Sequence, residues 1–172
     1  MKREILAYPD PVLAQKAAEI TEVTPELRQL VEDMVETMYE DDGIGLAAPQ
    51  VGESIRLVVI DITGPKLRED LRVLVNPVIT SREGEVESEE GCLSVIGLRA
   101  KITRSEKVTV DATDLDGNPV HIDADGLLAI CLQHEIDHLD GVLFIDYVSR
   151  LKRSLYDKKV RKWVKQKQRR SE

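Results

Sequence analysis

The chain reads GLLAICLQHEIDHLDG over residues 126–141, and this run predicts a helix over about 126–140. Asp123 or Asp125 is placed to cap the start of this helix, and Gly141 is placed to end it. Apolar residues stand on nearly every face of the helix, so we expect it to lie buried at the centre of the fold.

Two histidines of this helix point to a metal site. His134 and His138 are four residues apart, and a helix turns every ~3.6 residues, so both imidazoles can bind one metal ion. Glu135 can then reach a water molecule at that metal, which is the arrangement of a metal-assisted hydrolase. The chain has three histidines in all, and a buried helix must give such polar groups partners, which favours a metal site over a chance match.

The third metal ligand is not evident from the helix. Metalloproteases with this histidine spacing take it from downstream, where the chain offers Phe144 in place of a histidine, Glu172 at the terminus and Asp157 as a weak candidate. The upstream candidate is Cys92, which follows Gly91; a cysteine there can be a ligand, a nucleophile or, as is most common for a lone cysteine, a small buried core residue. One thiolate with two imidazoles leaves a position for water, as in catalytic zinc sites.

A third segment, GIGLAAPQVG at residues 43–52, is rich in small residues. It lacks the Gly-Lys-Ser/Thr ending of a phosphate-binding loop. Small residues allow a substrate to approach the backbone closely, and the side-chain amide of Gln50 can donate a hydrogen bond to a developing oxyanion. A glycine-rich turn before a strand is the alternative interpretation.

Length and composition predict one domain over residues 1–172, because 172 residues with 42% apolar and 33% charged content can bury a core. No apolar run approaches the ~20 residues of a membrane helix, and the first residues do not resemble a signal peptide. We therefore expect a cytoplasmic protein that does not enter the membrane. The two cysteines, Cys92 and Cys131, are expected to remain thiols there.

The remaining patterns predict an α+β fold, with antiparallel-rich sheets packed around the central buried helix that carries the metal ligands. A helix is expected to begin after Thr24, with Pro25 at its first position, and to end near Asp41. Four β-rich runs predict strands, a turn over residues 114–118 predicts a hairpin, and a further short strand and a C-terminal helix from about 148 follow. The five predicted strands cover residues 55–60, 71–80, 107–112, 120–124 and 142–145.

Charge is divided unevenly along the chain. Residues 150–172 hold eleven Lys or Arg and two acids, whereas residues 1–149 hold 13 basic and 30 acidic groups. A basic tail on an acidic body suggests a polyanionic partner for the tail, and a solvated helix face is the simpler alternative.

Together the three segments resemble the motifs of the peptide deformylase family. These are GIGLAAPQ at 43–50, EGCLS at 90–94 and QHEIDHLDG at 133–141, in the family's order and over essentially the whole chain. Family members commonly have proline where this chain has Ile96, a departure that touches none of the ligand positions.

The resemblance implies an enzyme that removes the N-formyl group from the initiator N-formylmethionine of nascent polypeptides and releases formate. Cys92, His134 and His138 would hold one divalent metal, Fe²⁺ in the cell, with Zn²⁺, Ni²⁺ or Co²⁺ possible in purified protein. Glu135 would be the general base, and the Gln50 amide and the Leu93 N–H would stabilise the oxyanion. The residues expected to bind the peptide and its methionine side chain are Ile44, Gly45, Gly91, Leu127, Ile130 and Cys131.

Further expectations concern the supporting residues and partners. Asp137 and an ion pair between Glu90 and Arg99 are predicted to orient the imidazoles, whereas His121 is expected to be an ordinary surface or core residue. In the family a C-terminal helix of this kind can dock on the ribosome, and we expect a monomer. Two rival hypotheses are a metalloendopeptidase and a non-enzymatic relative that has a structural metal or binds peptides or RNA.

Overall fold

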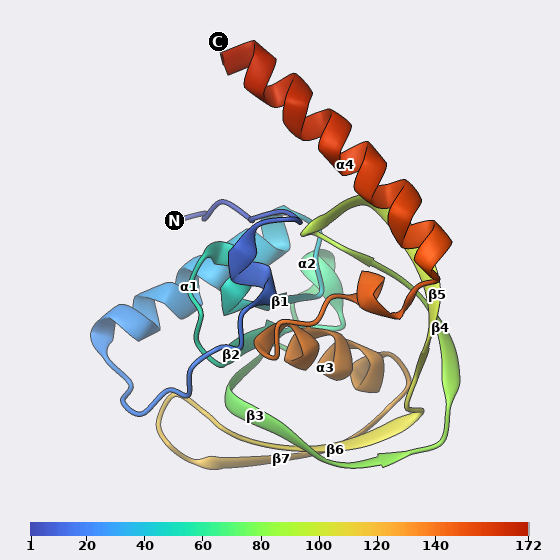
Figure 1. The fold of residues 1–172 in the computed structure, drawn as a ribbon. Coiled ribbons are helices and arrows are strands. Elements are labelled where there is room, and N and C mark those ends of the chain that lie inside the picture. Colours follow the sequence, from blue (N-terminus) through green and yellow to red (C-terminus); the bar gives the residue numbers. More distant parts are fainter. Residues whose placement is uncertain (172) are drawn as a thin grey trace.

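The centre of the fold is α3 (Gly126–Leu139), which packs against a five-stranded antiparallel sheet (Figure 1). The computed structural model describes residues 1–171. The sheet has the order β1-β2-β3-β6-β7, and a separate hairpin pairs β4 with β5. The strand bounds are β1 (Gly45–Ala47), β2 (Leu57–Ile60), β3 (Arg72–Glu83), β4 (Val86–Cys92), β5 (Val95–Arg104), β6 (Lys107–Thr113) and β7 (Pro119–Asp125). The predicted α+β class with antiparallel sheets around a central helix is confirmed.

Strand β2 is buried on both faces and separates two parts of the core. Val58 and Ile60 belong to the cluster formed with α3, while Leu57 and Val59 belong to the cluster formed with α1 (Pro25–Glu40). Side chains of a strand alternate between its faces, so a short, wholly apolar strand contributes to both clusters at once.

The ends of the two main helices follow the sequence patterns. Thr24 caps α1, because its hydroxyl accepts a hydrogen bond from the Leu27 N–H at 3.1 Å. Asp125 occupies the N-cap position of α3, although its side chain accepts no capping hydrogen bond. Gly141 follows the end of α3 with φ 75°, in the left-handed region, and a Cβ there would stand 2.5 Å from the Ala14 carbonyl oxygen.

The β4–β5 hairpin was not predicted from the sequence. Its acidic run, Glu85 to Glu90, has low β-propensity, yet alternate residues are buried. Ser88 and Glu90 face inward opposite Ile102 and Ala100 of β5, while Glu89 faces solvent. One buried face is therefore enough to maintain this pairing despite its composition.

The strand predicted over 142–145 is wrong. This part of the chain contains the 3₁₀ helix η3 (Phe144–Tyr147), in which Asp146 accepts a hydrogen bond from the Leu143 N–H. Its apolar residues are buried because they pack against β5 and α4, not because they join a sheet. Shorter helices elsewhere are η1 (Pro11–Ala14), η2 (Ala48–Val51) and α2 (Gly64–Leu67).

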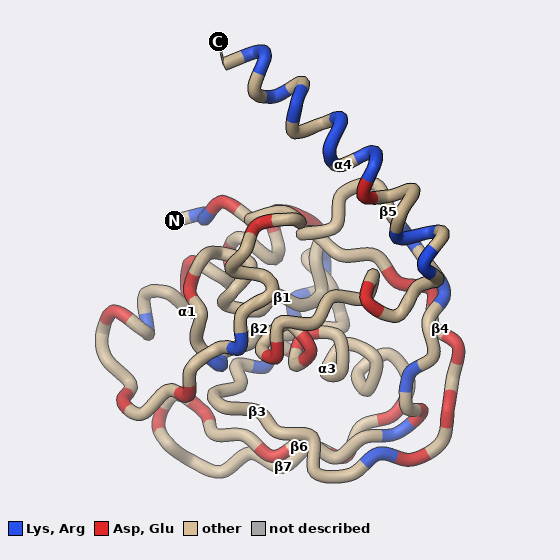
Figure 2. Tube along the Cα trace, in the orientation of Figure 1, with Lys and Arg blue, Asp and Glu red and all other residues tan. Residues whose placement is uncertain are grey.

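The C-terminal helix α4 (Arg150–Ser171) leaves the body of the molecule (Figure 1). Tyr156 and Val160 are buried in a third cluster with η1, β5 and η3, whereas residues 161–171 are exposed. The exposed part carries basic residues along its length (Figure 2). Within residues 1–171, no helix is both long and apolar enough to cross a membrane.

Candidate metal centre and cleft

Three candidate metal ligands from two distant parts of the chain meet at one point. Cys92 ends β4, while His134 and His138 lie one turn apart on α3. The sulfur of Cys92 lies 3.5 Å from Nε2 of His138, and one donor atom from each of the three residues lies within 4.8 Å of the others. In the described part of the chain, this is the one cluster of its kind.

The donor set fits a divalent transition metal. One thiolate and two imidazoles are ligands of zinc and of iron, and three protein ligands are the usual number in a catalytic site. Burial lowers the pKa of His138 well below its ordinary value, which keeps the imidazole neutral as a ligand must be. The residues present can therefore hold such an ion.

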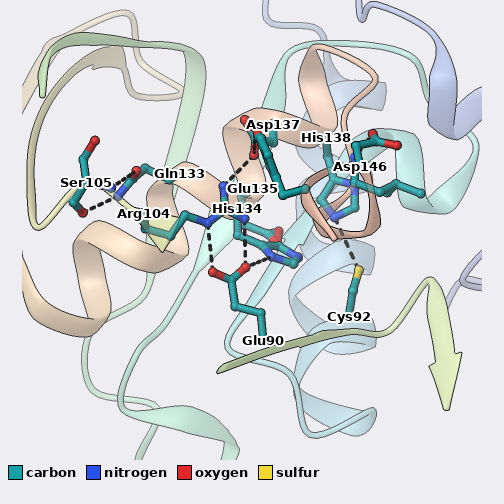
Figure 3. A network of polar contacts seen from close by, with 12 residues as sticks. Glu90, Cys92, Arg104, Ser105, Gln133, His134, Glu135, Asp137, His138 and Asp146 are labelled. Atoms are coloured by element: carbon teal, nitrogen blue, oxygen red, sulfur yellow. Dashed lines mark hydrogen bonds and ion pairs between the residues drawn. The ribbon is translucent and has the colours of Figure 1, made fainter. Parts of the chain in front are cut away.

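Glu90 orients the first of these imidazoles. Its Oε1 lies 2.9 Å from Nδ1 of His134, so that imidazole presents Nε2 to the metal position (Figure 3). Arg104 donates to both carboxylate oxygens of Glu90 at 2.8 Å. Burial alone would raise the pKa of Glu90, but hydrogen bonds from Arg104 and His134 lower it to about 2.

The predicted ion pair between Glu90 and Arg99 is therefore wrong. Glu90 faces inward on β4, whereas Arg99 is an outward-facing residue of β5 that lies 3.8 Å from exposed Glu89. The inward-facing cation is Arg104, which is only 6% exposed. Strand alternation thus selects Arg104 over Arg99 as the partner of Glu90.

Asp137 reaches the imidazoles indirectly. Its Oδ2 accepts a hydrogen bond from Nη1 of Arg104 at 2.6 Å and another from the Tyr147 hydroxyl at 3.0 Å. The buried guanidinium of Arg104 therefore binds two carboxylates, and Asp137 supports His134 through Arg104 and Glu90 (Figure 3). Such a network leaves the charge on Arg104 compensated.

Glu135 is a buried carboxyl group beside the candidate metal ligands. Its Oε2 has no hydrogen-bond partner among the described residues, and burial raises the pKa of Glu135 to about 7. The backbone of Gly45 approaches it so closely that a Cβ there would stand 2.9 Å from Cγ of Glu135. A carboxyl group with this pKa can exchange a proton near neutral pH.

The amide of Gln50 is fixed at both ends. Its Oε1 accepts from the Ala47 N–H at 2.9 Å, and its Nε2 donates to the Ser94 hydroxyl at 3.1 Å. The same nitrogen lies 3.5 Å from the Cys92 sulfur, which places an amide donor beside the candidate metal ligands. Leu93 lies in the turn that joins β4 to β5, next to Cys92.

The candidate site lies beside a cleft of about 770 Å³, whose lining includes Cys92 and His134. Both Gln50 and Glu135 line it, and its walls include Leu93, Val95 and Leu98. The six residues expected to bind substrate all line this cleft: Ile44, Gly45, Gly91, Leu127, Ile130 and Cys131. Burial, and next the charge of Glu135, raise the pKa of Cys131 to about 12, so its thiol stays neutral as part of the wall.

Sequence reasoning missed several supporting residues. Phe144, considered above only as a position lacking a histidine, has its ring centroid 6.2 Å from that of His134 in a stacked arrangement. Gln133 binds both the N–H and the carbonyl of Ser105, which ties α3 to the turn after β5 (Figure 3). The sequence signal available for Gln133 was an amide side chain next to His134 in a helix expected to be buried. His121 is an exposed residue of β7 and is not one of the three candidate ligands.

A family model, similar sequences and solved structures all match this chain to one protein family. The family model described as polypeptide deformylase matches residues 2–154. A peptide deformylase of Acidobacterium capsulatum is 54% identical over 162 residues, which cover 94% of this chain and 95% of that protein. One of Thermodesulfovibrio yellowstonii is 53% identical, covering 91% and 94%. The crystal structure of a peptide deformylase from Legionella pneumophila has a TM-score of 0.91 at 47% identity, covering 98% and 99%.

Proposed function

The chain belongs to the peptide deformylase family, a family of hydrolases, and we propose that it hydrolyses the N-formyl group of N-formylmethionyl peptides and releases formate. The observation that carries the proposal is the convergence of Cys92, His134 and His138 beside a buried Glu135, at the floor of an open cleft. These groups suit hydrolysis of a small, unactivated amide.

The proposed metal ligands are Cys92, His134 and His138, and the proposed ion in the cell is Fe²⁺. Zn²⁺, Ni²⁺ or Co²⁺ can occupy the same donor set in purified protein. A divalent ion held there would acidify water and polarise the formyl oxygen. Glu90 keeps Nε2 of His134 free for this purpose by binding Nδ1.

Glu135 is proposed as the general acid–base. It takes a proton from the attacking water molecule as oxygen bonds to the formyl carbon, and it passes that proton to the amine as the carbon–nitrogen bond breaks. Formate and a peptide with a free amino group result. A buried carboxyl group beside the reacting atoms can serve in both steps, and such a group is worth ~10²–10⁴-fold in rate.

Two donors are proposed for the oxygen that becomes negatively charged. The Nε2 of Gln50 is held beside Cys92 by its bonds to Ser94 and Ala47. The backbone N–H of Leu93 is the second, because Leu93 follows Cys92 and lines the same cleft. Donors that are fixed before the reaction need no reorganisation when the charge develops.

The cleft supports a peptide as the substrate. Within residues 1–171, β1 is the last strand of its sheet and β4 pairs only with β5, so each has one free edge, and residues of both line the cleft. Free backbone donors and acceptors on two edges can pair with an extended peptide. The apolar residues Ile44, Leu127 and Ile130 offer a pocket for the methionine side chain.

Substrate comparison tests this function. The wild-type protein, purified without oxygen and loaded with Fe²⁺, should release formate from formyl-Met-Ala-Ser and leave acetyl-Met-Ala-Ser intact. Cleavage of internal peptide bonds, with no advantage for formylated peptides, would instead support the endopeptidase hypothesis. A metal-loaded protein that cleaves neither substrate would contradict the proposal.

We also propose that the protein is a monomer with one domain over residues 1–172 and that it acts in the cytoplasm. There it would bind the ribosome through α4. The exposed part of α4 carries basic residues, which suits the phosphates of RNA.

Because Tyr156 and Val160 are buried, deletion from about residue 150 would remove part of the core. Replacing Lys165, Lys167, Arg169 and Arg170 with Gln tests docking without that loss. Ribosome binding should weaken and become less salt-dependent, while formate release from a free peptide persists.

A further inference from the structure

The first turns of α4 are part of the core, unlike the rest of this helix. Tyr156 and Val160 are 4% and 5% exposed, and they pack in one cluster with Val95 and Ala100 of β5. A second anchor is the Tyr8 hydroxyl, which donates to Oδ1 of Asp157 at 2.6 Å. The helix is therefore held firmly at its N-terminal end.

Two aromatic residues of α4 contact the start of β5, just beyond the turn that follows Cys92. The Tyr156 hydroxyl donates to the carbonyl oxygen of Ile96 at 2.8 Å. Trp163 lies over Gly97, where φ is 75° and a Cβ would stand 3.5 Å from the tryptophan ring. The two aromatic rings meet edge to face at 6.2 Å, so they form one contact surface.

The segment 93–97 consists of this turn (Leu93 and Ser94) and the first three residues of β5, and it forms one wall of the cleft. Leu93, Val95 and Gly97 all line it. The turn itself is held by the body of the protein, because Ser94 binds the Gln50 amide through its hydroxyl and the Tyr8 N–H through its carbonyl. For Ile96 and Gly97, the bond from Tyr156 is the only side-chain hydrogen bond within residues 1–171.

We propose that Tyr156 is a positioning residue of the cleft: its hydrogen bond to Ile96 holds the β5 part of the segment 93–97, so that α4 shapes the wall against which the peptide binds. This inference rests on the proposed deformylase function. Burial raises the pKa of Tyr156 to about 12, so the hydroxyl remains a donor throughout the neutral range. Neither Tyr156 nor Trp163 touches the reacting groups.

The effect should fall on peptide binding more than on the chemical step. Cys92 lies at the end of β4, and His134 is oriented by Glu90, so neither depends on the Ile96 carbonyl. Loss of one hydrogen bond of ordinary strength changes an equilibrium by about three- to tenfold. We expect Tyr156→Phe to raise KM for formyl-Met-Ala-Ser about three- to tenfold, with kcat within about twofold of wild type.

Tyr8→Phe is the matched control. It makes the same chemical change in the same cluster and also removes a hydrogen bond that anchors α4, but it leaves the bond to Ile96 in place. Its KM should stay within about twofold of wild type. Thermal unfolding of both variants checks that each remains folded and that their stabilities are similar.

Trp163 supplies a second readout that does not require turnover. It is the only tryptophan of the chain and lies over Gly97, so its fluorescence reports on the segment 93–97. Titration with the product Met-Ala-Ser should change its emission in wild type and in Tyr8→Phe. The titration midpoint of Tyr156→Phe should move to a concentration about three- to tenfold higher.

The outcomes separate this inference from the proposed function. Absence of formate release by wild type contradicts the function itself. Active wild type with equal KM values and equal titration midpoints for Tyr8→Phe and Tyr156→Phe overturns the positioning role, whether both values are unchanged or both are raised. A rise confined to Tyr156→Phe supports it.

Discussion

Glu90 accepts a hydrogen bond from Nδ1 of His134 at 2.9 Å while both of its oxygens are held by Arg104. Groups that orient a metal-binding histidine commonly contribute 10- to 100-fold to metal affinity. We therefore expect Glu90→Gln to weaken Zn²⁺ binding by about 10- to 100-fold, measured by competition with a chromophoric chelator. The amide carries no charge to balance Arg104 and presents one acceptor in place of two.

The control for this prediction is Glu89→Gln. Glu89 is the neighbouring residue on the same strand, but its side chain is 61% exposed and faces away from α3. Its replacement should leave Zn²⁺ affinity within about twofold of wild type. Equal affinities of the two variants would show that Glu90 does not support the metal ligand.

Gly45→Ala should damage catalysis more than stability. The new Cβ would stand 2.9 Å from Cγ of Glu135, so the carboxylate must move, and a displacement near 1 Å can cost about 10²-fold in rate. We expect kcat to fall by about 10- to 100-fold with unchanged metal content. Gly91→Ala is the comparison, because the atoms nearest to its Cβ would belong to the flexible side chain of exposed Arg99. It should raise KM while keeping most of kcat, and a similar fall in kcat for both variants would refute the contact with Glu135.

Gly141→Ala should destabilise the fold at the end of α3. Gly141 and Gly117 both have φ in the left-handed region, 75° and 82°, so alanine at either position carries about 1 kcal/mol of backbone strain. At Gly141 the Cβ would also stand 2.5 Å from the Ala14 carbonyl oxygen, whereas at Gly117 nothing lies within 4 Å. Urea unfolding should show Gly141→Ala less stable than Gly117→Ala by about 1–3 kcal/mol. Equal stabilities would mean that the backbone contact is not tight.

His121 should titrate above its ordinary range. Its Nδ1 lies 2.6 Å from Asp111, and its Nε2 lies 3.3 Å from Asp123. The hydrogen bond with Asp111 and then the charge of Asp123 raise the pKa of His121. The stabilisation is fully present below the unfolded pKa, about 6.5, and is lost as pH rises through the folded pKa.

NMR titration of the His121 ring protons measures this directly. The midpoint should lie above about 6.5 in wild type, and it should fall towards that value in Asp111→Asn. His121→Gln should be less stable than wild type at acidic pH and similar to it at alkaline pH. A midpoint at or below 6.5 would contradict the interaction.

The sequence was sufficient for the central helix and for its place in the fold. Apolar residues on nearly all faces of the helix that carries His134 and His138 indicated that this helix is buried. Gly141 marked its end, because only a residue that tolerates a left-handed backbone fits there. The cap at Thr24 was equally local. Such signals depend on neighbours within a few residues, so they are readable without knowledge of the fold.

The partners of Glu90 and the path after Gly141 could not be predicted in this way. Arg104 is fourteen residues from Glu90 and lies opposite Val86 in the β4–β5 pairing, so the two meet because both side chains are on the buried face of the hairpin. Residues 142–145 are apolar enough for a strand, but within residues 1–171 they join no sheet; Leu143, Phe144 and Ile145 pack in the cluster with β5 and α4, and η3 begins at Phe144. Both depend on contacts between distant segments, which short-range patterns do not contain.

Replacement of Glu135 by Gln tests the account most directly. The variant keeps the size and burial of the side chain but cannot accept a proton from water. With one equivalent of metal bound, formate release from formyl-Met-Ala-Ser should fall by about 10²–10⁴-fold relative to wild type. Full activity of metal-loaded Glu135→Gln would contradict the assignment of Glu135 and the mechanism built on it.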